Sequence, residues 1–309
     1  MLDDRDFIRL WFRTLNTVDE TSHSWPIQRQ YRAPEMVLRD RSFCWGERTY
    51  IMGIINLTSD SFSGDGLGTD PEAAVRLAWR MEAEGADILD IGAESSRPGA
   101  TETLPDEEMS RLLPALAAVR TATNLPLSVD TYHAETAIAA LAAGADMIND
   151  IWGLRQTGGA MADALATSGA RLVAMHNQRG REHTDVIRGI AAGFEATLAM
   201  AERAGIGLSR LILDPGFGFG WSPEQNLEML RRLPQLWTFG LPLLVGVSRK
   251  STIGLVLDAP VEDRFEGTAA AVAVAIAGGA DVVRVHDVGA MRRVARTTDA
   301  IVRDRWRSK

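Results

Sequence analysis

The chain has 309 residues, of which 46% are hydrophobic and 24% charged. This composition is typical of a soluble globular protein, and its length suits one large α/β domain. The net charge of −8 argues against a general nucleic-acid binder, and no apolar run approaches the roughly 18–20 residues of a membrane span. The one cysteine, Cys44, excludes an internal disulfide and a multi-cysteine metal site, and it fits a cytoplasmic location.

Residues 1–48 show no regular alternation of strand and helix patterns, and their aromatic residues and Pro26 suggest an extension that wraps the surface. From residue 49 onward, short apolar runs ending on a polar or charged residue alternate with segments long enough for one helix. These runs predict strands at 49–56, 86–91, 125–130, 145–150, 171–175, 210–214, 242–247 and 281–286. The phrase Gly-Ala-Asp ends three of the intervening helices, at 85–87, 144–146 and 279–281, and glycine favours the left-handed conformation that closes a helix.

Strands that alternate with helices in this way predict an α/β fold, a (β/α)8 TIM barrel over residues 49–309 that follows the N-terminal extension 1–48. A doubly wound sheet of the Rossmann type is the structural alternative. It is disfavoured because no GxGxxG motif follows the first strand and because polar residues end every strand. In a barrel the carboxyl ends of the strands build the active site, so we expect these polar residues to meet at one mouth.

Polar loops follow the first two strands. Asn56 precedes a loop rich in Ser, Asp and Gly, and its amide oxygen could bind Mg²⁺, which takes oxygen ligands. The alternative is an asparagine that caps its own loop. The segment ESSRPG at 94–99 offers hydroxyl groups and a guanidinium group suited to phosphate oxygens, or it is a plain surface turn.

Asp130, Asn149 and Asp214 each follow an apolar strand, so we expect them to be partly buried at the barrel mouth. A buried polar group that lacks a hydrogen bond costs about 1–3 kcal/mol. Several acceptors and an amide that face inward suit a flat heterocycle with N–H donors, such as a pterin or a purine. The alternative is that these residues brace neighbouring loops.

Cations gather near the end of the chain. Arg284 and His286 are two residues apart on the last strand and so point to the same side, toward the barrel interior. With Lys250 they predict an anion site, and Ser251 would begin a short helix whose N–H groups favour an anion such as a carboxylate. Lysine occurs at 250 and 309 alone, which suggests a site that needs a compact ammonium group. Because no nucleophile is paired with a base, we expect a bound nucleophile to displace an anionic leaving group.

Seven segments in chain order resemble the signature segments of dihydropteroate synthase. They are IINLTSDSF, DIGAESSRPGA, SVDTYHAETA, INDIWG, DPGFGFG, GVSRKSTIG and RVHDV, within residues 49–303. The resemblance implies a (β/α)8 barrel in which p-aminobenzoate displaces diphosphate from 6-hydroxymethyl-7,8-dihydropterin diphosphate, giving 7,8-dihydropteroate with the help of Mg²⁺. It also implies a homodimer through the late helices, and an aminobenzoate pocket that sulfonamides occupy.

The resemblance assigns roles by position in these segments. The metal-side ligand would be Asn56. The pterin ring would be held by Asp130, Asn149, Asp214 and Lys250, with Lys250 also reaching the junction between the substrates. The diphosphate would be bound by Ser96, Arg284 and His286, and the aminobenzoate pocket shaped by Phe62, Pro98, Phe219 and Ser251. The catalytic residues among these would be Lys250, Arg284, His286 and Asp130.

Three positions depart from the resemblance. Ser59 replaces a frequent proline, His133 replaces a frequent lysine in what we expect to be a surface change, and Trp221 replaces a common lysine at the expected pocket rim. The alternative functions are a pterin-binding barrel without synthase activity, such as a relative of methyltetrahydrofolate methyltransferases, and a barrel used for binding alone. The complete set of cations argues against both, because neither needs a diphosphate site.

Overall fold

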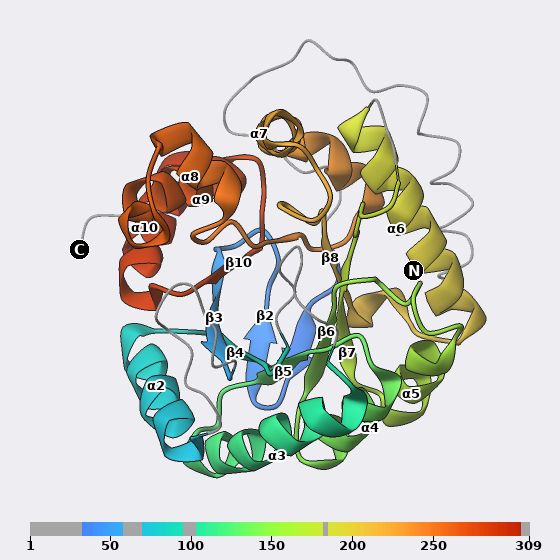
Figure 1. Cartoon of the computed structure of the whole chain (residues 1–309). Helices are drawn as coiled ribbons and strands as arrows, with labels where there is room; N and C mark the ends of the chain where they lie inside the picture. The colour runs from blue at the N-terminus through green and yellow to red at the C-terminus, as the bar shows by residue number, and fades with distance from the viewer. Residues whose placement is uncertain (1–32, 58–69, 95–102, 182–184, 304–309) are drawn as a thin grey trace.

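The computed structural model describes residues 33–57, 70–94, 103–181 and 185–303. Its central sheet consists of parallel strands: β3 (Tyr50–Asn56), β4 (Ile88–Gly92), β5 (Leu127–Asp130), β6 (Met147–Asp150), β7 (Arg171–Met175), β8 (Leu211–Asp214), β9 (Leu244–Val245) and β10 (Val282–Val285). They are ordered β8-β7-β6-β5-β4-β3-β10-β9, and a parallel bridge between Leu213 and Leu243 joins the two ends (Figure 1). The predicted eight-stranded barrel is therefore confirmed.

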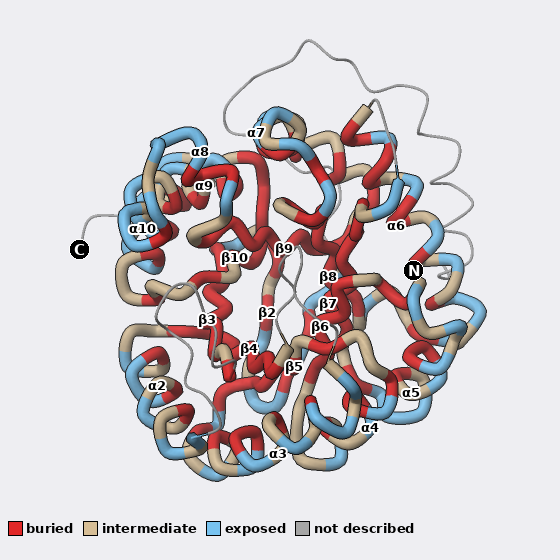
Figure 2. The backbone as a smooth tube through the Cα atoms, viewed as in Figure 1, coloured by how far each residue is buried: buried red, intermediate tan, exposed pale blue. Residues whose placement is uncertain are grey.

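Helices form a ring around these strands, as Figure 1 shows. They are α2 (Pro71–Glu84), α3 (Pro105–Ala122), α4 (Ala134–Ala142), α5 (Ala160–Ser168), α6 (Val186–Arg203), α7 (Pro223–Arg231), α8 (Ser251–Leu257), α9 (Phe265–Ala277) and α10 (Val288–Val302). The main hydrophobic core lies between this ring and the strands, where the tube in Figure 2 is coloured as buried. The helices thus surround the strands whose carboxyl ends form the mouth.

The Gly-Ala-Asp repeats act as predicted and also do more. Gly85, Gly144 and Gly279 adopt φ values of 95°, 101° and 93°, in the left-handed region that glycine tolerates. The aspartate that follows each one accepts a backbone N–H at the start of a neighbouring strand: Ile51 to Asp87, Leu127 to Asp146 and Leu243 to Asp281. Each repeat therefore ends a helix and fixes a strand at the amino end of the barrel.

One strand is shorter than predicted. The run 242–247 forms only the two-residue strand β9, Leu244–Val245. Pro242 cannot donate a ladder hydrogen bond because its nitrogen carries no hydrogen, although its carbonyl still accepts from the backbone N–H of Leu213 at 2.9 Å.

The end of the N-terminal extension does not wrap the surface. Strands β1 (Met36–Leu38) and β2 (Arg41–Phe43) form an antiparallel hairpin. The hairpin side chains Met36, Leu38 and Phe43 are at most 2% exposed, and with Trp45 they share a cluster with residues at the starts of the barrel strands, including Tyr50. This hairpin therefore closes the amino end of the barrel, opposite the mouth.

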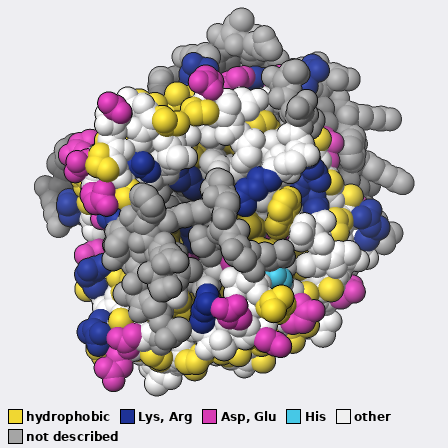
Figure 3. Space-filling view, viewed as in Figure 1, with side chains coloured by type: hydrophobic (Ala, Val, Ile, Leu, Met, Phe, Trp, Pro, Cys, Tyr) yellow, Lys and Arg dark blue, Asp and Glu magenta, His cyan; other side chains and the backbone are white. Residues whose placement is uncertain are grey.

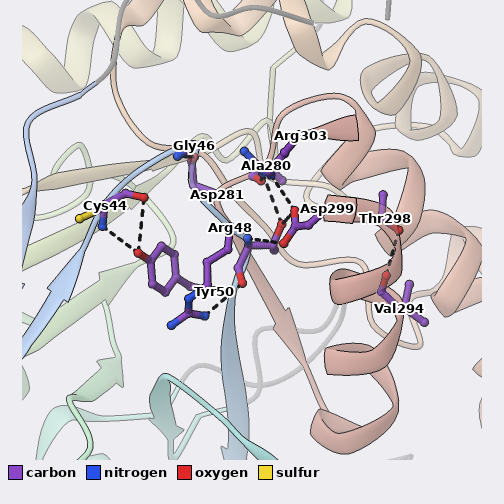
Figure 4. A network of polar contacts seen from close by, with 11 residues as sticks. Cys44, Gly46, Arg48, Tyr50, Ala280, Asp281, Val294, Thr298, Asp299 and Arg303 are labelled. Carbon is purple, nitrogen blue, oxygen red and sulfur yellow. Dashed lines mark hydrogen bonds and ion pairs between the residues drawn. The ribbon is translucent and has the colours of Figure 1, made fainter. Parts of the chain in front are cut away.

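A polar network ties the last helix to the same end (Figure 4). The carboxylate of Asp299 in α10 accepts hydrogen bonds from the backbone N–H of Thr49 at 2.7 Å and from its hydroxyl at 2.8 Å. Arg303 donates to Asp299 at 2.6 Å and to the carbonyl of Ala280 at 2.9 Å. Strand β3 and helix α10, at opposite ends of the barrel sequence, are thus fixed to each other.

The outer surface carries mixed charge. In Figure 3, basic and acidic side chains are interspersed on the face drawn. No described helix is both long enough and apolar enough to cross a membrane.

Candidate active site

The predicted polar residues of β3, β5 and β6 meet at one level of the barrel. Asn56 pairs in register with Gly92, Gly92 with Asp130, and Asp130 with Asn149. Neighbouring residues of a parallel sheet in register project to the same side, so these side chains form one layer at the carboxyl ends of the strands. Asn149 is 4% exposed, whereas Asn56 and Asp130 are half-buried. Their convergence confirms the expected mouth.

Arg284, which sequence analysis selected, and Asp90, which it did not, lie just below this layer. Arg284 of β10 donates from Nε to Asp90 Oδ2 at 2.6 Å and from Nη2 to Asp130 Oδ2 at 2.8 Å. Asn149 Nδ2 donates to the same Asp90 oxygen at 3.0 Å. Asp90 is fully buried in the middle of β4, so Arg284 is held between two carboxylates across the barrel interior.

Asp130 is placed so that its protonation is easily changed. Burial raises the pKa of its carboxyl group to about 7, and the carboxylate of Asp90 adds to this rise, while the positive charge of Arg284 opposes it. This is the kind of perturbed group that gathers at active sites.

Asp214 and Lys250 form the opposite side of the mouth. Asp214 ends β8, is 6% exposed and accepts the backbone N–H of Gly216 at 2.8 Å. Burial raises the pKa of the Asp214 carboxyl group, and the positive charge of Lys250 opposes that rise. Gly216 has a φ of 78°, and a Cβ there would lie 1.9 Å from the carbonyl oxygen of His176. The turn DPGFGFG thus needs glycine where it passes the end of β7.

Lys250 extends its ammonium group into the barrel mouth. Its Nζ donates to the carbonyl oxygen of Phe217 and lies 4.7 Å from the ring centroid of Phe219. Burial lowers the pKa of Lys250 to about 8, an effect that the carboxylate of Asp214 opposes and the charge of Arg284 reinforces. A Cβ on Gly246, which follows β9, would lie 3.7 Å from Arg284 Cβ and 4.0 Å from Lys250 Nζ, so both side chains pass beside this glycine.

Phe219 and Ser251 lie at the rim beside Lys250. Phe219 is 9% exposed and packs with Ile151 and Met175, and the guanidinium carbon of Arg179 lies 4.9 Å from its ring centroid. Ser251 is the first residue of α8 and is exposed, as predicted for the start of a short helix. The ring of Phe219 and the first residue of α8 thus both lie next to Lys250.

His286 follows β10 and lies apart from the carboxylates around Arg284. Its Nδ1 is 2.9 Å from the hydroxyl oxygen of Ser248. It lines a cavity of about 960 Å³ between α2 and α10 that also contains Arg249 and Asp287. The cavity is also lined by Arg76 and Arg80 of α2 and by Arg293 of α10. Arg284 and His286 therefore differ in their surroundings, although both were predicted to face the same anion.

Three predicted site residues, Phe62, Ser96 and Pro98, lie outside the described residues, as does Ser59. Trp221 does not stand at an open rim: it is 7% exposed, belongs to the main core, and its ring centroid lies 5.7 Å from that of His176. The replacement of a common lysine by Trp221 is therefore a change of core packing in this chain.

The residue expected to be a surface change, His133, is also partly buried. Its Nδ1 lies 2.9 Å from Glu108 Oε2 and 3.8 Å from Glu94 Oε2. Potential ligand atoms of Glu94, Glu108 and His133 all lie within 4.8 Å of one another, so this cluster could hold a metal ion. Burial also raises the pKa of the Glu94 carboxyl group, which hydrogen bonds from Thr103 and Tyr132 oppose.

Sequence reasoning missed Asp90 and Glu108 for different reasons. Asp90 left a signal, because it is a carboxylate inside the apolar run ILDIG, where a buried charge needs a partner. Glu108 left none, because it lies in an acidic first helical turn that reads as a solvated helix start.

The known proteins that resemble this chain are pterin-binding enzymes. The chain matches the family described as pterin binding enzymes over residues 52–286. It is 44% identical over 269 residues to dihydropteroate synthase of Clostridium beijerinckii, covering 87% of this chain and all of that protein. The structure of dihydropteroate synthase from Clostridium difficile in the presence of pteroic acid superposes with a TM-score of 0.80 at 44% identity, covering 84% of this chain and 98% of that one. That of Xanthomonas albilineans with 4-aminobenzoic acid gives 0.81 at 42% identity, covering 87% and 98%.

Proposed function

This chain belongs to the dihydropteroate synthase family of pterin-binding enzymes, and from that membership we propose how its residues carry out the family's reaction. The protein is a transferase that condenses 6-hydroxymethyl-7,8-dihydropterin diphosphate with p-aminobenzoate to 7,8-dihydropteroate and diphosphate. The observation that carries the assignment of residues is that two carboxylates in one barrel mouth each have a cation near them: Asp130 pairs with Arg284, and the charge of Lys250 acts on buried Asp214.

The pterin ring binds between Asp214 and the layer of Asp130 and Asn149. Acceptors on both sides of the mouth match the N–H and amino donors of a pterin edge, and desolvation inside the barrel strengthens these bonds. Lys250 lies beside Asp214 and above Phe219, so its ammonium group reaches both the pterin and the pocket of the second substrate.

The diphosphate is bound by His286, Arg284 and Ser96. His286 borders the arginine-lined cavity between α2 and α10, which suits an anion better than the carboxylate-rich pterin side does. Arg284 would contact the diphosphate from the barrel interior, where Asp90 and Asp130 hold its guanidinium group in place.

Mg²⁺ is the metal cofactor we propose, with Asn56 as its protein ligand. The Asn56 side chain is half-buried at the mouth, and no described residue hydrogen-bonds to it, so its amide oxygen fits one position of an ion that otherwise keeps waters and substrate phosphates. When bound, Mg²⁺ would neutralise charge on the diphosphate.

The p-aminobenzoate binds against Phe219, with Phe62, Pro98 and Ser251 completing its pocket. The start of α8 presents backbone N–H groups to the carboxylate, beside the hydroxyl group of Ser251. Its amine then faces the exocyclic carbon of the pterin near Lys250.

The reaction is a dissociative displacement. The bond between the exocyclic carbon and the diphosphate oxygen breaks, the electron-rich dihydropterin stabilises the cation that develops, and the amine nitrogen forms the new C–N bond and loses a proton. Arg284 and His286 stabilise the charge that develops on the leaving diphosphate, because preorganised donors in a dry site act more strongly than water does. Lys250 and Asp214 orient the pterin for the attack.

Diphosphate release from the pterin substrate, measured with and without p-aminobenzoate, tests this assignment. We expect release that depends on p-aminobenzoate and yields 7,8-dihydropteroate, and at least a hundredfold lower kcat/KM for Arg284→Met. Pterin binding without turnover would instead favour the non-catalytic relative. Unchanged turnover in Arg284→Met would remove Arg284 from the diphosphate site.

We also propose a homodimer through the late helices. Leu255, Val256 and Phe265, on α8 and α9, are 67%, 61% and 40% exposed, and adjacent apolar residues of this kind mark an interface. Light scattering during size exclusion should give twice the chain mass for the wild type and a lower mass for Val256→Asp. Ile138→Asp, at an equally exposed position on α4, is the matched control and should leave the mass unchanged.

The location we propose is the cytoplasm, because the sole cysteine, Cys44, needs no oxidising compartment. Fractionation of cells that express the full chain tests this, and recovery outside the cytoplasmic fraction would contradict it.

A further inference from the structure

A buried group of two carboxylates and one imidazole lies beside the barrel mouth, outside the residues assigned to the reaction. Glu94 follows β4, Glu108 lies in the first turn of α3, and His133 is the residue before α4. Three elements that are separate in the sequence thus bring their polar side chains to one point.

Two oxygen atoms of this group lack a hydrogen-bond partner although they are buried. They are Glu108 Oε1 and Glu94 Oε2. The Glu108 side chain is 0% exposed and that of Glu94 is 9% exposed, and bulk solvent does not reach either of these two atoms. Buried acceptors of this kind need a donor or a cation.

The other polar atoms of the two carboxylates are already oriented by neighbours. Tyr132 donates from its hydroxyl to Glu94 Oε1 at 3.0 Å, and the backbone N–H of Thr103 donates to the same atom at 3.0 Å. The hydroxyl of Thr131 donates to Glu108 Oε2 at 3.0 Å. Outer hydrogen bonds that fix the direction of a ligand are typical of built metal sites.

The distances within the group fit a small divalent ion. His133 Nδ1 is hydrogen-bonded to Glu108 Oε2 at 2.9 Å and lies 3.8 Å from Glu94 Oε2. A tetrahedral ion with bonds of about 2.1 Å places its ligand atoms about 3.4 Å apart. One ligand atom from each of the three residues lies within 4.8 Å of the others, so the ion would replace the His133 hydrogen bond and draw the ligand atoms together.

We propose that Glu94, Glu108 and His133 form a binding site for one divalent transition-metal ion of the Zn²⁺ class, separate from the magnesium ligand Asn56. An imidazole nitrogen with two carboxylates favours Zn²⁺, Mn²⁺ or Co²⁺ over Mg²⁺, which prefers oxygen ligands alone. The ion joins Glu94 at the end of β4 to the starts of α3 and α4. The backbone N–H of Thr103 also donates to Glu94. An ion bound to Glu94 would therefore fix the residues on both sides of the segment 95–102.

Cobalt provides the direct test, because Co²⁺ in a tetrahedral protein site absorbs visible light far more strongly than hydrated Co²⁺ does. The full-length protein is stripped with a chelator, dialysed and titrated with Co²⁺ in the presence of millimolar Mg²⁺. We expect one equivalent to bind per chain with micromolar or tighter affinity, Zn²⁺ to displace it, and Zn²⁺ to raise Tm. Absence of saturable Co²⁺ and Zn²⁺ binding would overturn the proposal.

Variants distinguish this site from other ligands in the chain. His133→Lys removes a ligand but supplies an ammonium group that pairs with the two carboxylates, so the protein should stay folded while Co²⁺ binding weakens at least tenfold. Glu108→Gln should weaken it similarly, which keeps the test decisive if one variant unfolds. Asn56→Ala is the control and should retain the full cobalt spectrum. Unchanged affinity in both cluster variants would overturn the assignment.

Discussion

The Nε atom of Arg284 lies 2.6 Å from Asp90 Oδ2, and this contact links β10 to β4, the two strands that flank β3. In the proposed diphosphate site, Arg284 would have to keep its guanidinium group turned toward the substrate anion. A charged pair with a fully buried partner holds the guanidinium plane in one orientation, which an exposed aspartate would not do. Asp90 is therefore a positioning residue for the proposed diphosphate site.

Substitution of Asp90 should affect catalysis through Arg284. Asp90→Asn keeps the shape but removes the charge, and the loss of one partner from a buried pair costs about 3–5 kcal/mol. We expect kcat/KM to fall at least about a hundredfold, with KM for the pterin substrate raised. Ser128→Ala is the control, because Ser128 is buried and pairs in register with Asp90. An Asp90→Asn enzyme within about threefold of the wild type would contradict the positioning role.

Lys250 should not tolerate replacement by arginine. A Cβ on Gly218 would already lie 2.9 Å from Lys250 Cδ, so the site has little space for a planar guanidinium group. We expect Lys250→Arg to lose at least about tenfold in kcat/KM, and Lys250→Met to lose as much or more. Steady-state rates of both variants show whether activity needs the shape of the Lys250 side chain or only its charge. If Lys250→Arg works within about twofold of the wild type, charge alone suffices.

The ammonium group of Lys250 should titrate well below the usual range for lysine. Because burial lowers its pKa to about 8, deprotonation should occur near pH 8 in the free enzyme. Carbon-13 NMR of reductively methylated protein measures this, and Lys250→Arg identifies the signal by removing it. Asp214→Asn should move the midpoint lower still, since the Asp214 carboxylate favours the charged amine. A midpoint above pH 10 would show that Lys250 is solvated.

The same shift gives a sign for stability. The unfolded chain holds the Lys250 proton between about pH 8 and the ordinary lysine pKa near 10.4, whereas the folded protein does not. The contribution of this group to the free energy of unfolding therefore rises with pH across that window.

Two glycines with similar backbone angles should respond differently to alanine. Gly216 and Gly205 have φ values of 78° and 74°, but only Gly216 has a neighbour in the way: a Cβ would lie 1.9 Å from His176 O, whereas nothing lies within 4 Å at Gly205. Gly205→Ala should cost about 1–2 kcal/mol of unfolding free energy from the left-handed conformation alone. Gly216→Ala should cost about 3 kcal/mol or more. Equal urea midpoints for the two variants would contradict the close approach.

The hairpin at the closed end should support stability without taking part in catalysis. Phe43 is 1% exposed in the cluster that closes the amino end of the barrel, so Phe43→Ala should lower the free energy of unfolding by about 3–5 kcal/mol. Val37→Ala, at a 47% exposed position in the same hairpin, should change stability by less than about 0.5 kcal/mol. KM for both substrates should stay within about twofold of the wild type in each variant, because the mouth lies at the other end. A large rise in KM for Phe43→Ala would show that the two ends communicate.

The sequence predicts that polar residues at strand ends meet at the barrel mouth. It does not predict which side chains pair across neighbouring strands. Asn56, Asp130, Asn149 and Asp214 follow apolar runs, and parallel strands necessarily bring such positions to one end. The pairing of Arg284 with Asp90 depends on strand tilt and register, which no local pattern encodes.

His133 and the N-terminal hairpin show the same limit. His133 reads as a surface position because helix starts are usually solvated, yet Glu108 from another helix covers it. The hairpin residues lie in an irregular segment whose aromatics fit a surface wrap as well as a barrel floor. Their burial depends on the open end of the barrel, which exists only after the strands assemble.

The bond between Thr49 and Asp299 joins residues 250 positions apart, which has a consequence during synthesis. A ribosome releases Thr49 long before Asp299. Through most of translation, β3 therefore lacks its hydrogen-bonded partner in α10. Until then the growing chain keeps open strand edges and an unfilled seam, features that favour association with other chains. We therefore expect stalled or truncated nascent chains to depend on holding chaperones, and the final turns of the chain to decide when the enzyme leaves that protection.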